Sequence, residues 1–74
     1  MGNYTNAFGR VVRTVRAAQG MTQKQLAGRA GVSPSVIAAY ERGVRSPSWR
    51  SALAIGDALG VTLDQLAGRA PVEI

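Results

Sequence analysis

The sequence contains no cysteine and no histidine in 74 residues. The lack of cysteine excludes disulfides and thiolate metal sites, and the lack of histidine removes the commonest general base and metal ligand. Its apolar runs are too short to span a membrane, and its N-terminal residues lack the apolar core of a signal peptide. We therefore predict a cytoplasmic protein that binds no metal and no cofactor.

Catalytic groups are also scarce. The chain has no carboxylate pair and no glycine-rich phosphate loop, and its glycines fall where helices would end. An enzyme is therefore the least favoured class of function. The length allows one domain, at residues 1–74, with a core at about residues 6–67, a frayed N-terminus and a short C-terminal tail.

Acidic residues are few, and they are unevenly placed. Residues 1–50 hold eight of the nine basic side chains and a single acid, Glu41. Residues 51–74 hold only Arg69 against three acids. General solubility is an equally good explanation of the basicity by itself, so its meaning depends on the helical motif in the same half of the chain. A basic N-terminal half favours a polyanionic partner, and nucleic acid first.

The stretch from Thr22 to Gly43 carries signals for two short helices joined by a tight turn. Thr22 is placed as an N-cap, and Gln25 three residues later completes a capping box. Gly31 suits the left-handed position that ends a helix. Ser33 is a second N-cap, followed by Pro34 at the first helical position.

This stretch resembles the helix-turn-helix of the Cro/repressor (Xre-type) family of DNA-binding proteins. The matching residues are Gln23, Leu26-Ala27, Gly31-Val32-Ser33, Ile37 and Glu41-Arg42-Gly43. With the flanking helices, the resemblance covers about residues 8–67. It implies an all-α, compact five-helix bundle of the lambda-repressor-like DNA-binding type, in which helices 2 and 3 form the helix-turn-helix. It also implies an ion pair between Arg16 in the first helix and Glu41 in the third.

The remaining helices are predicted from the spacing of apolar residues and from the glycines and hydroxyl residues that end and begin helices. A first helix should run from a cap at Asn6 to about Ala18, burying Phe8, Val11, Val12 and Val15. Its Arg10 and Arg13 lie off that stripe and should be solvated. A joint of glycine, apolar residue and hydroxyl cap occurs three times, at Gly20-Met21-Thr22, Gly31-Val32-Ser33 and Gly60-Val61-Thr62.

A fourth helix should span about Ser48 to Leu59, and Thr62 should cap a short fifth helix that ends near Ala67. Trp49 is expected to be a core or lid residue, with Leu53 on the same apolar side. Gly56 either permits a close helix crossing or weakens the fourth helix, since glycine costs about 0.5–1 kcal/mol relative to alanine inside a helix.

If the resemblance holds, the third helix enters the major groove of DNA. Its outward residues, the expected base-reading set, are Pro34, Ser35, Ala38, Ala39 and Arg42. Expected phosphate contacts are Thr22, Gln23, Lys24, Arg45 and Arg50. The base-reading set contains no Asn or Gln, so part of the specificity should come from DNA shape.

The resemblance further implies a homodimer on a palindromic operator, paired through Leu63, Leu66, Val72 and Ile74. Val72 and Ile74 have no evident partner within the chain. The predicted function is a transcriptional regulator of double-stranded DNA, either a repressor or an autoregulator. The alternatives are the antitoxin of a toxin–antitoxin pair, which would also bind a toxin protein, and a restriction–modification controller.

Overall fold

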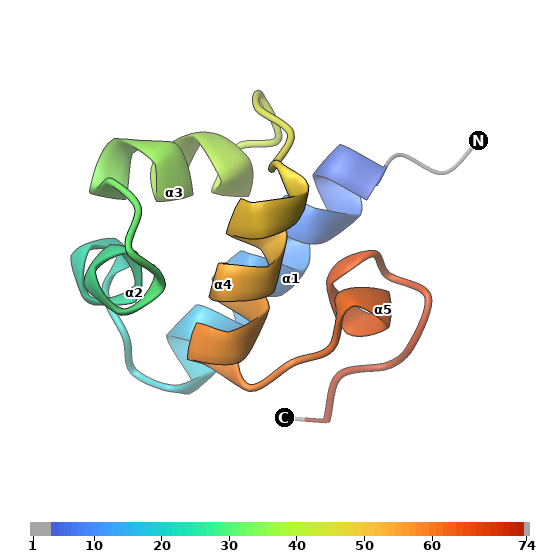
Figure 1. The fold of residues 1–74 in the computed structure, drawn as a ribbon. Coiled ribbons are helices and arrows are strands. Elements are labelled where there is room, and N and C mark those ends of the chain that lie inside the picture. Colours follow the sequence, from blue (N-terminus) through green and yellow to red (C-terminus); the bar gives the residue numbers. More distant parts are fainter. Residues whose placement is uncertain (1–3, 74) are drawn as a thin grey trace.

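The computed structural model describes residues 4–73, and the side chains of residues 7–73. Within them the chain folds into five helices and no strand, which confirms the all-α prediction (Figure 1). The helices are α1 (Tyr4–Ala18), α2 (Gln23–Ala30), α3 (Pro34–Glu41), α4 (Trp49–Leu59) and α5 (Leu63–Leu66). None of these helices is long and apolar enough to cross a bilayer.

The N-terminal boundary differs from the prediction. Helix α1 begins at Tyr4, so Asn6 lies inside the helix and is not its N-cap. Tyr4 and Thr5 are the first two residues of the helix. The first three residues of the predicted frayed end lie outside the described part of the chain.

Helices α2 to α5 all begin at a hydroxyl cap. The side chains of Thr22, Ser33, Ser48 and Thr62 each accept a hydrogen bond from the backbone N–H three residues later. The glycines of the three predicted joints, Gly20, Gly31 and Gly60, have φ of 67°, 72° and 74°. All three joints therefore form as the local sequence predicts, and the connections between helices are short.

Each of the five helices contributes buried residues to one core. Leu26, Ile37 and Ile55 are completely buried, and Leu66 of α5 is 2% exposed. Phe8 of α1 meets Tyr40 of α3 edge to face, with ring centroids 5.3 Å apart. The buried residues of α3 therefore hold the second helix of the motif against α1.

Trp49 and Leu53 do not occupy the predicted core positions. Trp49 is 70% exposed and Leu53 is 39% exposed. Helix α4 buries the rest of its predicted apolar side as a stripe, which consists of Ala52, Ile55, Gly56 and Leu59. Trp49 and Leu53 lie four residues apart on the flank of that stripe, so they share a surface that the rest of the chain leaves uncovered.

Two helical glycines permit close approach between backbones. A Cβ atom at Gly56 would lie 3.0 Å from the carbonyl oxygen of Val61 and 3.3 Å from Cδ1 of Leu66, so this glycine serves a close crossing. A Cβ atom at Gly9 would lie 2.0 Å from the carbonyl oxygen of Tyr40. Helix α1 thus rests directly on the last turn of α3. The implied Arg16–Glu41 pair had placed these two helices together, but the role of Gly9 was not predicted.

Candidate nucleic-acid interface

Helices α2 and α3 pack against each other and are joined by a short turn that local hydrogen bonds hold in place (Figure 1). The N–H of Val32 donates to the carbonyl of Ala27 at 3.0 Å, and Gly31 takes the left-handed conformation that this bond requires. Ala27 is 1% exposed. Its small side chain allows the two helices to approach closely, so α3 is displayed at the surface at a fixed angle.

One side of α3 is buried in the core and the other side is at the surface. Ile37 and Tyr40 are buried in the core. The five residues predicted to read bases lie on the other side, where Pro34, Ser35 and Arg42 are exposed and Ala38 and Ala39 are half-buried. The short side chains of the alanines leave the backbone of α3 close to the surface. The structure therefore groups these five residues on one accessible face.

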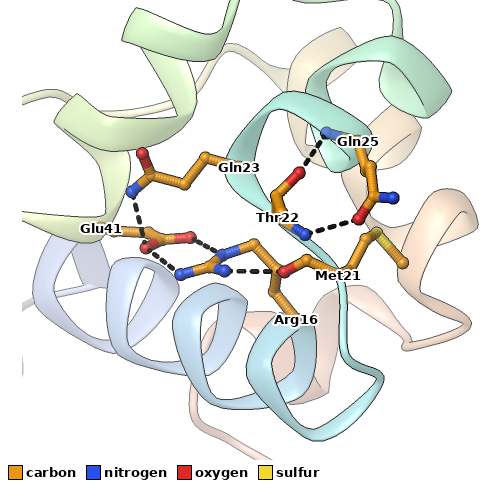
Figure 2. A network of polar contacts seen from close by, with 6 residues as sticks. All are labelled: Arg16, Met21, Thr22, Gln23, Gln25 and Glu41. Atoms are coloured by element: carbon orange, nitrogen blue, oxygen red, sulfur yellow. Dashed lines mark hydrogen bonds and ion pairs between the residues drawn. The ribbon is translucent and has the colours of Figure 1, made fainter.

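An ion pair locks α3 to α1 (Figure 2). Arg16 donates from Nε to Oε2 of Glu41 at 2.6 Å and from Nη2 to Oε1 at 3.0 Å. Its Nη1 donates to the carbonyl of Met21 at 2.7 Å. The paired forks match the planar geometry of guanidinium and carboxylate. This is the pair that the family resemblance implied, and it also fastens the start of α2.

The network shifts the titration of both partners. Burial of the Glu41 carboxyl raises its pKa, but hydrogen bonds from Arg16 and Gln23 and the charges of Arg16 and Arg13 outweigh burial and hold the pKa below its ordinary value. The hydrogen bond to Glu41 raises the pKa of Arg16, against a smaller opposing effect of desolvation. The pair therefore remains ionised at neutral pH.

Gln23 has a structural contact that the sequence interpretation lacked. Its Nε2 donates to Oε1 of Glu41 at 3.1 Å, as Figure 2 shows. Beside it, the hydroxyl of Thr22 accepts a hydrogen bond from the N–H of Gln25, and the N–H of Thr22 donates to Oε1 of Gln25. These hydrogen bonds hold Thr22 and Gln23 at the start of α2, next to the Arg16–Glu41 pair.

The other predicted phosphate contacts are also at the surface. Lys24, Arg45 and Arg50 are exposed. Lys24 lies in the first turn of α2, whereas Arg45 and Arg50 come from the α3–α4 connection and the start of α4. The expected phosphate contacts thus divide between the segments that precede and follow α3.

Two arginines that the sequence interpretation left as merely solvated lie near this face. Arg10 and Arg13 are exposed, and together with Arg42 they line a hollow between α1 and the end of α3. The position of Arg10 and Arg13 near α3 could have been inferred from the sequence. The implied pairing of Arg16 with Glu41 already placed α1 beside the end of α3, and Arg13 lies one turn before Arg16.

The predicted pairing surface needs correction. Leu66 is 2% exposed and fills the core of its own chain, so its side chain is not available to a second copy. Val72, expected to lack a partner, is half-buried against the core beside Val11 and Val15. Leu63 is also half-buried, and Ile74 lies outside the described residues. Among residues 7–73, the exposed large apolar residues are instead Val44, Trp49 and Leu53.

Comparison with known proteins gives a consistent result. The Helix-turn-helix family profile matches residues 12–66. The chain is 37% identical over 60 residues to YazB of Bacillus subtilis, an uncharacterised HTH-type transcriptional regulator, covering 81% of this chain and 87% of that protein.

Two solved structures share the arrangement of helices. The restriction-modification controller protein C.AhdI from Aeromonas hydrophila is 32% identical, with a TM-score of 0.79, over 84% of this chain and 94% of that chain. The P22 c2 repressor, solved in complex with a synthetic operator, is 28% identical, with a TM-score of 0.81, over 85% and 96% of the two chains.

Proposed function

The chain belongs to the helix-turn-helix family of Cro/repressor (Xre) type, and from this premise we propose that it is a transcriptional regulator that binds a specific double-stranded DNA sequence as a dimer. The observation that carries the proposal is the accessible face of α3. Most of the side chains on that face are small, and the face lies in the basic half of the chain. The Arg16–Glu41 ion pair holds the end of α3 against α1.

Base recognition in this proposal is sparse. The hydroxyl of Ser35 can hydrogen-bond several bases, and Ala38 or Ala39 can meet a thymine methyl group. Arg42, at the end of α3, is the one charged member of the set. A face with so few hydrogen-bonding groups favours a contribution from sequence-dependent DNA shape.

Phosphate contacts would fix the position of α3 in the groove. Thr22, Gln23 and Lys24 stand at the start of α2, where free backbone N–H groups also favour an anion. Arg45 and Arg50 would contact the backbone beyond the end of α3. Such contacts carry no sequence information themselves, but each lowers the slope of log K against log salt by about 0.9.

Selection of bound duplexes from a random pool, at about 150 mM salt, tests the proposal. We expect an enriched inverted repeat whose half-sites lie about one helical turn apart. Substitution Ser35→Ala should change the preference at one position in each half-site while leaving the fold intact, because the side chain is exposed. A pool without an enriched motif, together with binding that vanishes on addition of salt, would contradict sequence-specific recognition.

We place the dimer contact on the uncovered apolar surface of α4 and α5. Trp49 is 70% exposed and forms part of the rim of a hollow of about 300 Å³, whose lining also includes Pro47, Ala52, Leu63 and Ala67. A large exposed side chain at the rim of a hollow suits a two-fold contact, because each copy can fill the other. A domain of this size is also marginal alone and gains stability from a partner subunit.

The substitution Trp49→Ala should shift the chain towards monomer. A buried indole contributes 150–250 Å² of contact, so its loss should weaken self-association at least tenfold. Sedimentation equilibrium of the free protein, over a range of concentrations, measures this. Val44→Ala is the matched control, since Val44 is 69% exposed and belongs to the α3–α4 connection, outside the hollow. Equal association constants for both variants would rule out this surface.

A restriction–modification controller is a second candidate for the biological role. It is favoured by the 32% identity and nearly full-length match to such a controller. A selected operator that lies beside methyltransferase and nuclease genes would support it. The predicted toxin partner remains a prediction, for which co-purification of a second protein is the direct test.

A further inference from the structure

The outward stripe of α1 forms a surface of its own. Arg10, Arg13, Thr14 and Ala17 follow the i, i+3, i+4, i+7 spacing of one helix face, and all four are exposed. They line one wall of a hollow of about 380 Å³, and Glu41, Arg42 and Gly43 at the end of α3 line the other. We call this the arginine hollow, defined by Arg10, Arg13 and Arg42.

The arginine hollow is continuous with the face of α3 that is proposed to read bases. A neighbouring hollow of about 400 Å³ is lined by Arg13, Arg42 and Glu41, and also by Ala38 and Gln23. Three residues are therefore shared between the two hollows. A ligand that touches Ala38 and Gln23 lies next to Arg13, and Arg10 is one helical turn further out.

The charge of this region is strongly positive. Its only acid is Glu41, and both carboxylate oxygens are already engaged by Arg16 and Gln23. Among the described residues, neither Arg10 nor Arg42 hydrogen-bonds a carboxylate, and Arg13 acts on Glu41 only through its charge. Three guanidinium groups thus face one hollow with no acid left to neutralise them.

We propose that Arg10 and Arg13, on the α1 wall of the arginine hollow, bind the DNA backbone, so that α1 is a third DNA-contacting element beside α2 and α3. This inference rests on the proposed function and extends it. A guanidinium offers a planar fork of donors that matches a phosphate, and it is held charged at any physiological pH. Arg10 and Arg13, stacked one turn apart, would follow the strand as it leaves the groove occupied by α3.

The salt dependence of DNA binding tests this assignment. The double variant Arg10→Gln/Arg13→Gln should reduce the magnitude of the slope of log K against log salt by about 1.8, because two phosphate contacts are lost. The matched control is Arg29→Gln/Arg69→Gln, which removes the same net charge from exposed positions at the end of α2 and in the C-terminal segment. Its slope should stay close to that of the wild type.

The measurement uses fluorescence anisotropy with the selected duplex and with an unrelated duplex. The α1 variant should bind both more weakly and keep the wild-type sequence preference, because phosphate contacts specify no base. Circular dichroism melting should show that both double variants are folded at the temperature of the binding assay, with Arg13→Gln removing only a minor charge interaction with Glu41.

If the α1 variant and the control share one slope, Arg10 and Arg13 make no phosphate contact, although DNA binding itself stands. A changed sequence preference in the α1 variant would overturn the phosphate assignment in favour of base contact. A wild-type chain that binds neither duplex overturns the proposed function and this inference together.

Discussion

Replacement of Gly9 by alanine is expected to destabilise the fold by about 3 kcal/mol or more, above the usual range for an overpacked site. The new Cβ atom would lie 2.0 Å from the carbonyl oxygen of Tyr40, which is backbone and cannot rotate aside like a flexible side chain. That oxygen also accepts the N–H of Gly43 at 3.0 Å. Relief of the clash therefore requires α1 to move away from α3, which weakens the Phe8–Tyr40 contact and the ion pair.

Chemical denaturation followed by circular dichroism measures this loss. The matched control is Gly28→Ala, the same substitution in a helix where the added Cβ meets no atom within 4 Å. Because alanine is the better helix former, Gly28→Ala should stabilise the protein by about 0.5–1 kcal/mol. If Gly9→Ala were as stable as the wild type, the close contact between α1 and α3 would be wrong.

Loss of the Arg16 guanidinium should cost up to about 3 kcal/mol, the lower end of the range for removal of one partner of a buried ion pair, because this pair is only partly buried. In Arg16→Ala, the Glu41 side chain, which is 5% exposed, would lose both of its charged contacts, and the carbonyl of Met21 would lose its donor. Arg16→Lys should recover only part of the loss, because an ammonium group lacks the planar fork. Thermal unfolding of the wild type, Arg16→Lys and Arg16→Ala measures their stabilities, which should decrease in that order.

The same pair predicts how stability depends on pH. The pKa of Glu41 is lower in the folded chain than its unfolded value of about 4.3, so the folded state holds its proton less tightly. The stabilisation is complete above the unfolded pKa and is lost as pH falls through the folded pKa. The free energy of unfolding, measured from pH 7 to 2.5, should therefore decline more steeply in the wild type than in Glu41→Gln. Parallel curves would contradict this contribution.

Much of the fold was predictable because its signals are local. Thr22, Gly31 and Ser33 act within three or four residues of themselves, so their capping roles follow from spacing alone. The Arg16–Glu41 pair spans 25 residues, and only the family resemblance implied it. The outward face of α3 was also predicted from that resemblance, and the burial of Ile37 and Tyr40 on the opposite side agrees with it.

The errors concern contacts between distant segments. Trp49 was predicted to be a core or lid residue, yet α4 has only one buried stripe, and Trp49 lies beside it and is 70% exposed. Leu66 was assigned to a partner chain although the core of its own chain needed it. Gly9 resembled any helical glycine. Its importance depends on the separation of α1 and α3, which no local pattern encodes.

The division of α3 into two faces has a consequence for how this protein can evolve. Ile37 and Tyr40 hold the helix in the core, whereas Pro34 and Ser35 are exposed. Under the proposed function, substitutions on the exposed side would alter the preferred DNA sequence with little effect on folding. Duplicated copies of this gene could therefore diverge to control different promoters while keeping one scaffold.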